Sequence, residues 1–197
     1  MSYELPAHLI PAFNRRFERG TELARDVIIL DDGTGLRKPK PGFWARRKAR
    51  KALQHLQQCT AMLPEHWPSL WVIGKIWQAL GEQQTALAHF ARAVHLHPTQ
   101  VDLLREASIA AVDAGAPAEA VQFSALALQQ RPDDSGLLCN HAVNLLLNGQ
   151  DEAALTTIGR ALALEPTNAI NRNADRLIRA VLAGTRARPT WQELASR

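Results

Sequence analysis

Residues 67–100 read WPSLWVIGKIWQALGEQQTALAHFARAVHLHPTQ. Gly81 lies near the middle of this stretch and Pro98 lies near its end. A glycine readily adopts the left-handed backbone that ends a helix, whereas a proline lacks the N–H donor that a helix interior needs. The stretch therefore predicts two helices joined by a short turn and closed by a proline.

The same punctuation recurs along the chain with a period of 34 residues. Four prolines keep this spacing, and three glycines each follow a proline by 17 residues: Pro64, Pro98, Pro132 and Pro166; Gly81, Gly115 and Gly149. Two rows of small residues share the period: Ala52, Ala86, Ala120 and Ala154; Cys59, Ala93, Ala127 and Ala161. Small side chains at fixed positions allow helices to cross closely, so the period predicts stacked helix pairs.

The repeat resembles that of the tetratricopeptide repeat (TPR) family, which has bulky, small and proline positions at fixed places. The first copy carries nearly all of them: Leu70, Ile73, Gly74, Trp77, Ala86, Phe90, Ala93 and Pro98. Later copies depart from the pattern, because Ala107, Ala111 and Ser124 are small where bulk is usual and His141 replaces a leucine. The resemblance implies an all-α fold, a TPR-type right-handed α-solenoid of stacked helix-turn-helix hairpins.

The period also divides the chain into segments. Three full repeats are expected at residues 67–100, 101–134 and 135–168, and one helical half repeat at residues 43–66. Residues 169–197 are expected to hold a capping helix with Asn168 as its N-cap, and a short terminal helix with a Thr190–Glu193 capping box. Residues 1–42 follow no period and are expected to be a non-repeat N-terminal segment and linker.

The resemblance implies a concave groove lined by the first helix of each repeat, which would hold a peptide or helix of another protein. Its predicted partner-binding residues are Trp71, Lys75, Gln78, Arg105, Ile109, Asn140 and Val143. Two alternatives stay open: Trp71 packs on the preceding helix near Phe43 or Trp44, and Arg105 pairs with a neighbouring acid. The family's clamp for chaperone C-terminal carboxylates is not expected, because its positions hold Trp71, Lys75, Glu106, Gly136 and Asn140.

Charge suggests a second reading. The formal charge is +5 over residues 1–66, −5 over residues 67–166 and +4 over residues 167–197. A basic patch without acids begins in the linker: Arg37, Lys38, Lys40, Arg46, Arg47, Lys48, Arg50 and Lys51. Such a cluster predicts contact with nucleic acid or an anionic membrane surface, with a merely solvated helix face as the alternative. Residues 1–42 folding into the groove or onto a second copy is a third hypothesis.

Other classes are excluded or disfavoured by composition. With 46% hydrophobic and 21% charged residues, the 197-residue chain is typical of a globular domain. No apolar run is long enough to span a bilayer and no secretory leader precedes the repeats, while two isolated cysteines favour a reducing cytoplasm. Without HExxH, paired cysteines or a glycine-rich phosphate loop, we expect no enzyme activity, metal or cofactor. The expected role resembles that of bacterial adaptors, assembly factors and secretion chaperones.

Overall fold

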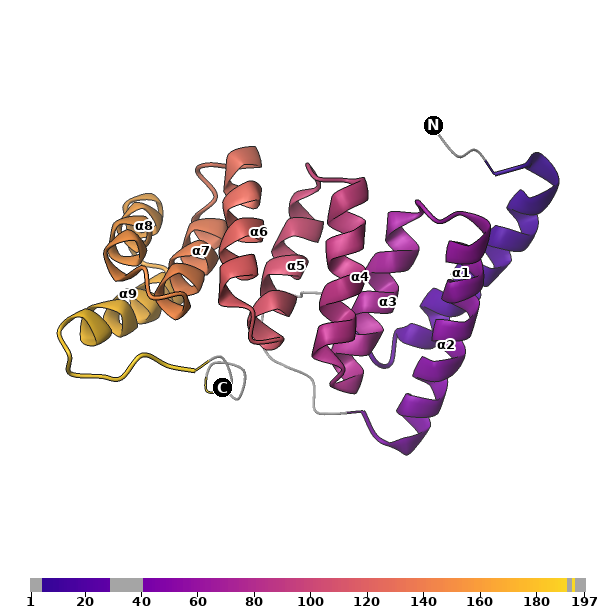
Figure 1. The fold of residues 1–197 in the computed structure, drawn as a ribbon, viewed down its shortest axis with the longest axis horizontal. Helices are drawn as coiled ribbons and strands as arrows, with labels where there is room; N and C mark the ends of the chain where they lie inside the picture. Colours follow the sequence, from indigo (N-terminus) through magenta and orange to yellow (C-terminus); the bar gives the residue numbers. More distant parts are fainter. Residues whose placement is uncertain (1–4, 29–40, 191–192, 194–197) are drawn as a thin grey trace. The chain divides into compact units, whose positions relative to one another are not determined.

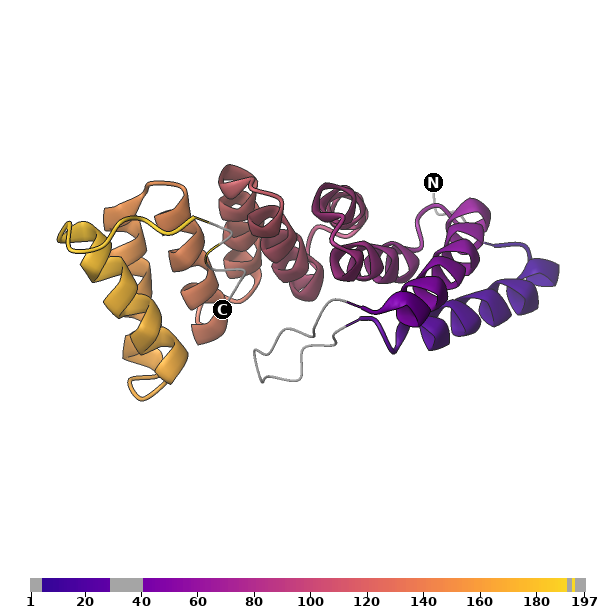
Figure 2. The ribbon, with the colours of Figure 1, turned by 90° about the horizontal axis from the view of Figure 1, so that it is seen from below.

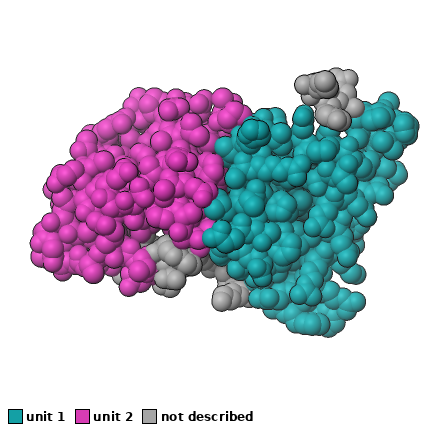
Figure 3. Space-filling view, viewed as in Figure 1, with its two compact units in different colours: residues 1–97 teal, residues 98–197 magenta. Residues whose placement is uncertain are grey.

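The computed structural model describes residues 5–28, 41–190 and 193. Their regular secondary structure is entirely helical, with no strand among them (Figure 1). The helices are η1 (Ala7–Leu9), α1 (Ile10–Ala24), α2 (Phe43–Met62), α3 (Trp67–Leu80), α4 (Gln83–Leu96), α5 (Val101–Asp113), α6 (Pro117–Gln130), α7 (Ser135–Leu147), α8 (Asp151–Leu164) and α9 (Ala169–Leu182). They form two compact units, Met1–His97 and Pro98–Arg197, shown in teal and magenta in Figure 3.

Glycines end the first helix of three hairpins, as the sequence predicts. Gly81, Gly115 and Gly149 have φ values of 90°, 73° and 80°, in the left-handed region. After α3, the backbone N–H of Glu82 donates to the Trp77 carbonyl at 2.9 Å and that of Gly81 donates to Gln78 at 3.1 Å. These bonds satisfy carbonyls that the end of a helix leaves without partners, so the chain reverses within a few residues.

In unit 1, α1 packs along α2 and α3 packs along α4 (Figures 1 and 2). Each pair has a glycine where the helices approach most closely. A Cβ on Gly74 would lie 2.9 Å from the Phe90 ring, and one on Gly20 would lie 2.8 Å from Leu56 Cγ. Neither distance allows a side chain without movement of its neighbour, so both glycines are required by packing.

The packing of α1 against α2 adds to the sequence analysis, which separated residues 1–42 from the repeats. Val27 and Ile28 are buried in the same core as Ala24, Leu53 and Leu56. The helical register of this pair is interrupted by the long connection between α1 and α2, which hides it from a search for a fixed period. Residues 29–40, which contain most of the predicted linker, lie outside the described part of the chain.

In unit 2, α5 packs along α6, α7 packs along α8, and α9 covers the last pair. The predicted rows of small residues lie in its interior, where Ala120, Ala127, Ala154 and Ala161 are each 0% exposed. The N-cap prediction for α9 is confirmed, because Asn168 Oδ1 accepts from the backbone N–H groups of Ile170 and Asn171 at 2.9 and 3.2 Å.

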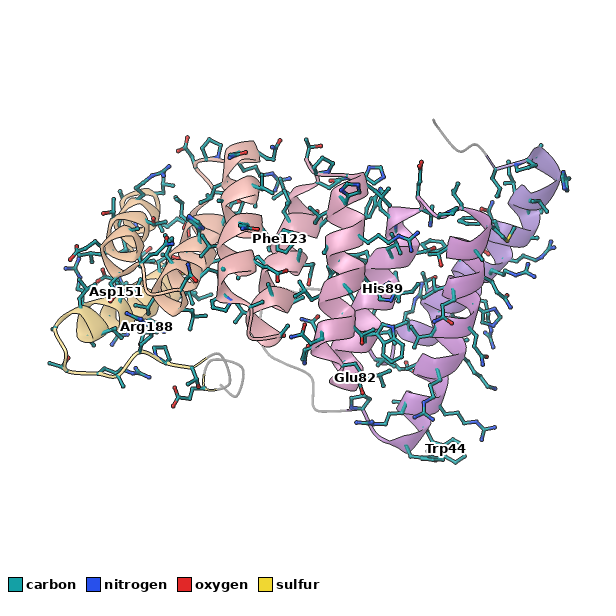
Figure 4. The ribbon with its side chains drawn as sticks, viewed as in Figure 1. Trp44, Glu82, His89, Phe123, Asp151 and Arg188 are labelled. Atoms are coloured by element: carbon teal, nitrogen blue, oxygen red, sulfur yellow. The ribbon has the colours of Figure 1, made fainter. Side chains whose placement is uncertain are left out.

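The C-terminal capping box is also confirmed. The Thr190 N–H donates to Glu193 Oε2 at 2.8 Å, and the Glu193 N–H donates to Thr190 Oγ1 at 3.3 Å. The segment between α9 and this box returns to α8, where Arg188 Nη2 donates to both carboxylate oxygens of Asp151 at 2.8 and 2.7 Å (Figure 4). This ion pair fixes the segment beside an open pocket of about 530 Å³ lined by residues 149–153 and by Val181 and Leu182.

Candidate functional site

The first helices of the unit 2 hairpins are joined directly to one another. Asn144 Nδ2 on α7 donates to Ser108 Oγ on α5 at 2.7 Å, and Asn171 Nδ2 on α9 donates to Ser135 Oγ on α7 at 2.8 Å. All four side chains are buried, with exposures of 5% or less. The bonds therefore hold α5, α7 and α9 in one layer.

The sequence contains a signal for this layer that the periodicity analysis missed. Both bonds join a serine to the asparagine 36 residues later, and the two bonds are themselves 27 residues apart. Each asparagine amide also donates to a buried carbonyl of a second helix, Ala120 at 3.3 Å and Ala161 at 3.4 Å. A search for recurring buried polar pairs, in addition to apolar positions, would have found them.

Four of the predicted groove residues lie on this layer. Arg105 and Ile109 on α5 are half-buried, Asn140 on α7 is exposed, and Val143 on α7 is half-buried against the core of unit 2. Their helices are adjacent, so their outward side chains belong to one continuous surface of the unit. We call these four residues the layer surface.

The other three predicted groove residues lie on α3 of unit 1. Trp71 is half-buried and packs against the core formed by α1, α2 and α3, Lys75 is only 8% exposed, and Gln78 is half-buried. Phe43 and Trp44 are 73% and 70% exposed, so the core of the unit, and not this aromatic pair, provides the packing of Trp71. Neither unit contains all seven predicted residues.

His141 occupies the position where the repeat usually has a leucine. Its Nδ1 lies 2.7 Å from Ser124 Oγ on α6, at another position where the chain departs from the pattern. The two departures compensate each other, since a small hydroxyl residue leaves room for the ring and supplies its hydrogen-bond partner. Burial lowers the pKa of His141, which keeps the imidazole neutral inside the unit.

The side chains nearest to catalytic chemistry are unreactive in this setting. Burial raises the pKa of the Cys139 thiol to about 11, so the nucleophilic thiolate is scarce at neutral pH. Among residues 5–28, 41–190 and 193, no group of three or more His, Cys, Asp or Glu side chains could hold a metal ion. Within the same residues, no helix has the length and apolar character that crossing a bilayer requires.

The described part of the predicted basic patch lies on α2. Arg46, Arg47, Lys48, Arg50 and Lys51 are all exposed. Lys48 Nζ pairs with Asp26 Oδ2 at 2.6 Å, and Arg46 Nε donates to the Pro41 carbonyl at 3.1 Å. Arg37, Lys38 and Lys40 lie outside the described residues.

Comparison with known proteins gives a likeness of structure. No family model matches the sequence, and no curated protein matches it. Among solved structures, a tetratricopeptide repeat protein from Parabacteroides merdae aligns with a TM-score of 0.66 at 16% identity, over 87% of this chain and 61% of that one. This chain has the tetratricopeptide repeat fold.

Two other TPR structures align closely and were described with peptides or a peptide site. The first TPR of Spaghetti (RPAP3), bound to an HSP90 peptide, has a TM-score of 0.54 at 20% identity over 59% of this chain and 93% of that one. YrrB, described as a TPR protein with an unusual peptide-binding site, has a TM-score of 0.59 at 16% identity, over 86% of this chain and 88% of that one. The all-helical TPR solenoid predicted from the 34-residue period is confirmed.

Proposed function

We propose that the chain is a non-catalytic protein-interaction module that holds a peptide or helix of another protein on the first helices of its repeats. The observation that carries the proposal is the layer of α5, α7 and α9, in which two buried Asn–Ser bonds set three helices side by side. A layer fixed in this way offers a partner a pre-organised surface, which lowers the entropy lost on binding.

The chemistry of the layer surface suits an extended peptide or a helix. Ile109 and Val143 provide partly exposed apolar contacts, and Asn140 offers an exposed amide that can both donate to and accept from a peptide backbone. Arg105 adds a guanidinium for a carbonyl or carboxylate oxygen. Trp71 and Gln78 on α3 would supply a second set of contacts in unit 1, where the half-buried indole is already oriented by its packing.

Peptide binding by proteins of the same fold supports this proposal at the level of the fold. One of these proteins binds an HSP90 peptide. The carboxylate clamp known from the family is not expected in this chain, where Glu106 and Gly136 occupy positions that the clamp fills with other residues. We therefore expect a partner that is recognised along its length and not by its terminal carboxylate.

The finer assignments form part of the same proposal. We infer repeat boundaries at residues 67–100, 101–134 and 135–168, with the half repeat at 43–66 and the capping segment at 169–197. An adaptor, assembly-factor or chaperone-like role in a bacterial cytoplasm is the setting we favour. The raised pKa of Cys139 and the interior position of His141 support the absence of catalysis.

A matched pair of surface substitutions tests the binding face. Asn140→Arg places a large cation on the layer surface, whereas Thr156→Arg places the same group on the exposed side of α8, a second helix. Tagged full-length protein would be used to recover partners from cells that express it naturally. We expect recovery to fall about tenfold with Asn140→Arg, the equivalent of about 1.4 kcal/mol, and to be unchanged with Thr156→Arg. Equal recovery by both variants, or equal loss, would contradict the proposal.

A further inference from the structure

The beginning of α2 exposes two aromatic side chains to solvent. Phe43 and Trp44 are 73% and 70% exposed, the highest values among the large hydrophobic side chains of the described residues. Their rings pack edge to face, with centroids 5.4 Å apart and planes at 78°. Figure 4 shows Trp44 projecting away from the end of the helix. Exposing two such rings forgoes burial that typically stabilises a fold by about 1.5–3 kcal/mol per large side chain.

Unpaired cations lie beside these rings. Helix α2 carries five basic and no acidic residues. Lys48 and Arg46 have partners in Asp26 and the Pro41 carbonyl, but Arg47, Arg50 and Lys51 make no hydrogen bond or ion pair with any described residue. The helical period of 3.6 residues places these three on the same side of α2 as the two rings. We call this set the α2 outer face: Phe43, Trp44, Arg47, Arg50 and Lys51.

This distribution of charge does not stabilise the helix that carries it. The N-cap residue Gly42 has no side-chain hydrogen bond to the helix, and the first turn contains no acidic residue. Cations near the positive end of a helix dipole are unfavourable, by about 0.3–1 kcal/mol each. An anion bound along the α2 outer face would relieve the repulsion, so the arrangement is explained better by a ligand than by stability.

We propose that the α2 outer face binds single-stranded nucleic acid. Unpaired bases would stack on Phe43 and Trp44, and the phosphates that follow would contact Arg47, Arg50 and Lys51. With a rise of about 1.5 Å per residue, the face extends for about 12 Å along the helix, a length suited to a short tract of a strand. Combined aromatic stacking and arginine contacts are the usual means of binding strands without sequence preference.

The geometry favours a strand over a lipid surface. An interfacial helix inserts its apolar face among the lipids, but the apolar face of α2, with Ala49, Leu53 and Leu56, is buried in the core of unit 1. It also favours a single strand over a duplex, because stacking on a side chain requires an unpaired base. Binding here would be independent of the surface on the first helices proposed for protein partners.

Fluorescence anisotropy with labelled 20-nucleotide oligo-U and oligo-dT would test the proposal on the full chain. Three phosphate contacts should give a slope of about −2 when the logarithm of affinity is plotted against the logarithm of salt concentration. Phe43→Ala with Trp44→Ala should weaken binding about tenfold or more at an unchanged slope. Arg47→Gln with Arg50→Gln and Lys51→Gln should abolish most of the slope.

A control removes the same number of exposed arginines from α9, through Arg172→Gln, Arg176→Gln and Arg179→Gln. We expect this variant to bind the oligonucleotides like the wild type, and thermal unfolding would verify that every variant is folded. The proposal is overturned if neither oligonucleotide binds at 25 mM salt, or if the α9 variant loses as much affinity as the α2 variant. Binding to vesicles containing phosphatidylserine without binding to oligonucleotides would also overturn it, in favour of a membrane surface.

Discussion

The α3/α4 hairpin of unit 1 and the α5–α7–α9 layer of unit 2 follow one 34-residue period with different chemistry. In the hairpin, the fully buried Phe90 ring lies against Gly74, so shape alone sets the approach of the helices. In the layer, small residues surround buried Asn–Ser bonds. Both units keep one shared contact, an arginine that donates to a proline carbonyl 28 residues earlier: Arg92 to Pro64 and Arg160 to Pro132.

The difference shows that the period determines where helices stop and cross, while the material between them is free to vary. Apolar packing tolerates sliding between similar side chains, whereas a buried amide and hydroxyl must meet or remain unsatisfied. The Asn–Ser bonds therefore specify which helices are neighbours in unit 2. The proposed binding surface lies on that layer.

The largest effect is expected from Phe90→Ala in the hairpin. Removing a fully buried ring typically costs about 3–5 kcal/mol, and the helices cannot collapse into the space easily because Gly74 already lies at the point of closest approach. Urea denaturation would measure the loss. Phe123→Ala on α6 is the matched control, where the half-buried ring should cost clearly less. Equal losses would mean that the hairpin does not depend on this contact.

A smaller effect is expected from the layer. Asn144→Ala should cost about 2–3 kcal/mol, because the Ser108 hydroxyl and the Ala120 carbonyl lose a partner in the interior. A double-mutant cycle with Ser108→Ala should give a coupling free energy of about 1 kcal/mol.

The control cycle pairs Ser108→Ala with Asn171→Ala, whose side chain bonds to a different serine. Its two effects should be additive to within about 0.5 kcal/mol. If both cycles gave the same coupling, the bonds would not specify pairs of helices and the comparison between the units would fail.

Glycine substitutions compare a crowded site with an open one. Gly74→Ala should lower the free energy of unfolding by about 1–2 kcal/mol, because the new methyl group would overlap the Phe90 ring. Gly159→Ala in α8 has no atom within 4 Å of its new Cβ and should raise that free energy by about 0.5–1 kcal/mol. Thermal and urea unfolding of both variants would check the opposite signs; a stabilised Gly74→Ala protein would contradict the close helix contact.

The smallest effect concerns pH in unit 2. The folded pKa of His141 is lowered by burial, so its stabilising contribution is full above the ordinary histidine pKa of 6.5 and is lost as the pH falls through the lowered folded value. Wild type should therefore lose stability relative to His141→Leu between neutral and mildly acidic pH. Comparing the two proteins cancels the similar shifts of His66 and His89. A constant difference across this range would show that His141 is not coupled to folding.

The parts of the fold that depend on backbone punctuation are predictable from the sequence. Gly81, Gly115 and Gly149 end helices where expected, and Asn168 and Thr190 cap as expected. The pairing of α1 with α2 was not predictable, because its evidence is a single contact between Gly20 and Leu56 across a long connection. Such a contact depends on tertiary packing, and no local pattern records it.

The candidate site was predictable only as a set of positions. Register places Lys75 and Asn140 on the same side of their repeats, yet Lys75 is 8% exposed and Asn140 is exposed. Exposure depends on what each neighbouring helix covers, and those neighbours differ in size from copy to copy. The bond between His141 and Ser124 illustrates this, since each residue alone reads as a departure from the pattern.

Site-specific photo-crosslinking tests the proposed binding face most directly. A photoreactive phenylalanine would replace exposed residues of first helices, Asp102 and Asn140, or exposed residues of second helices, Gln122 and Thr156, in the cells that express the protein. The account predicts adducts with a partner protein from positions 102 and 140 and none from positions 122 and 156. Adducts confined to the second helices would contradict it.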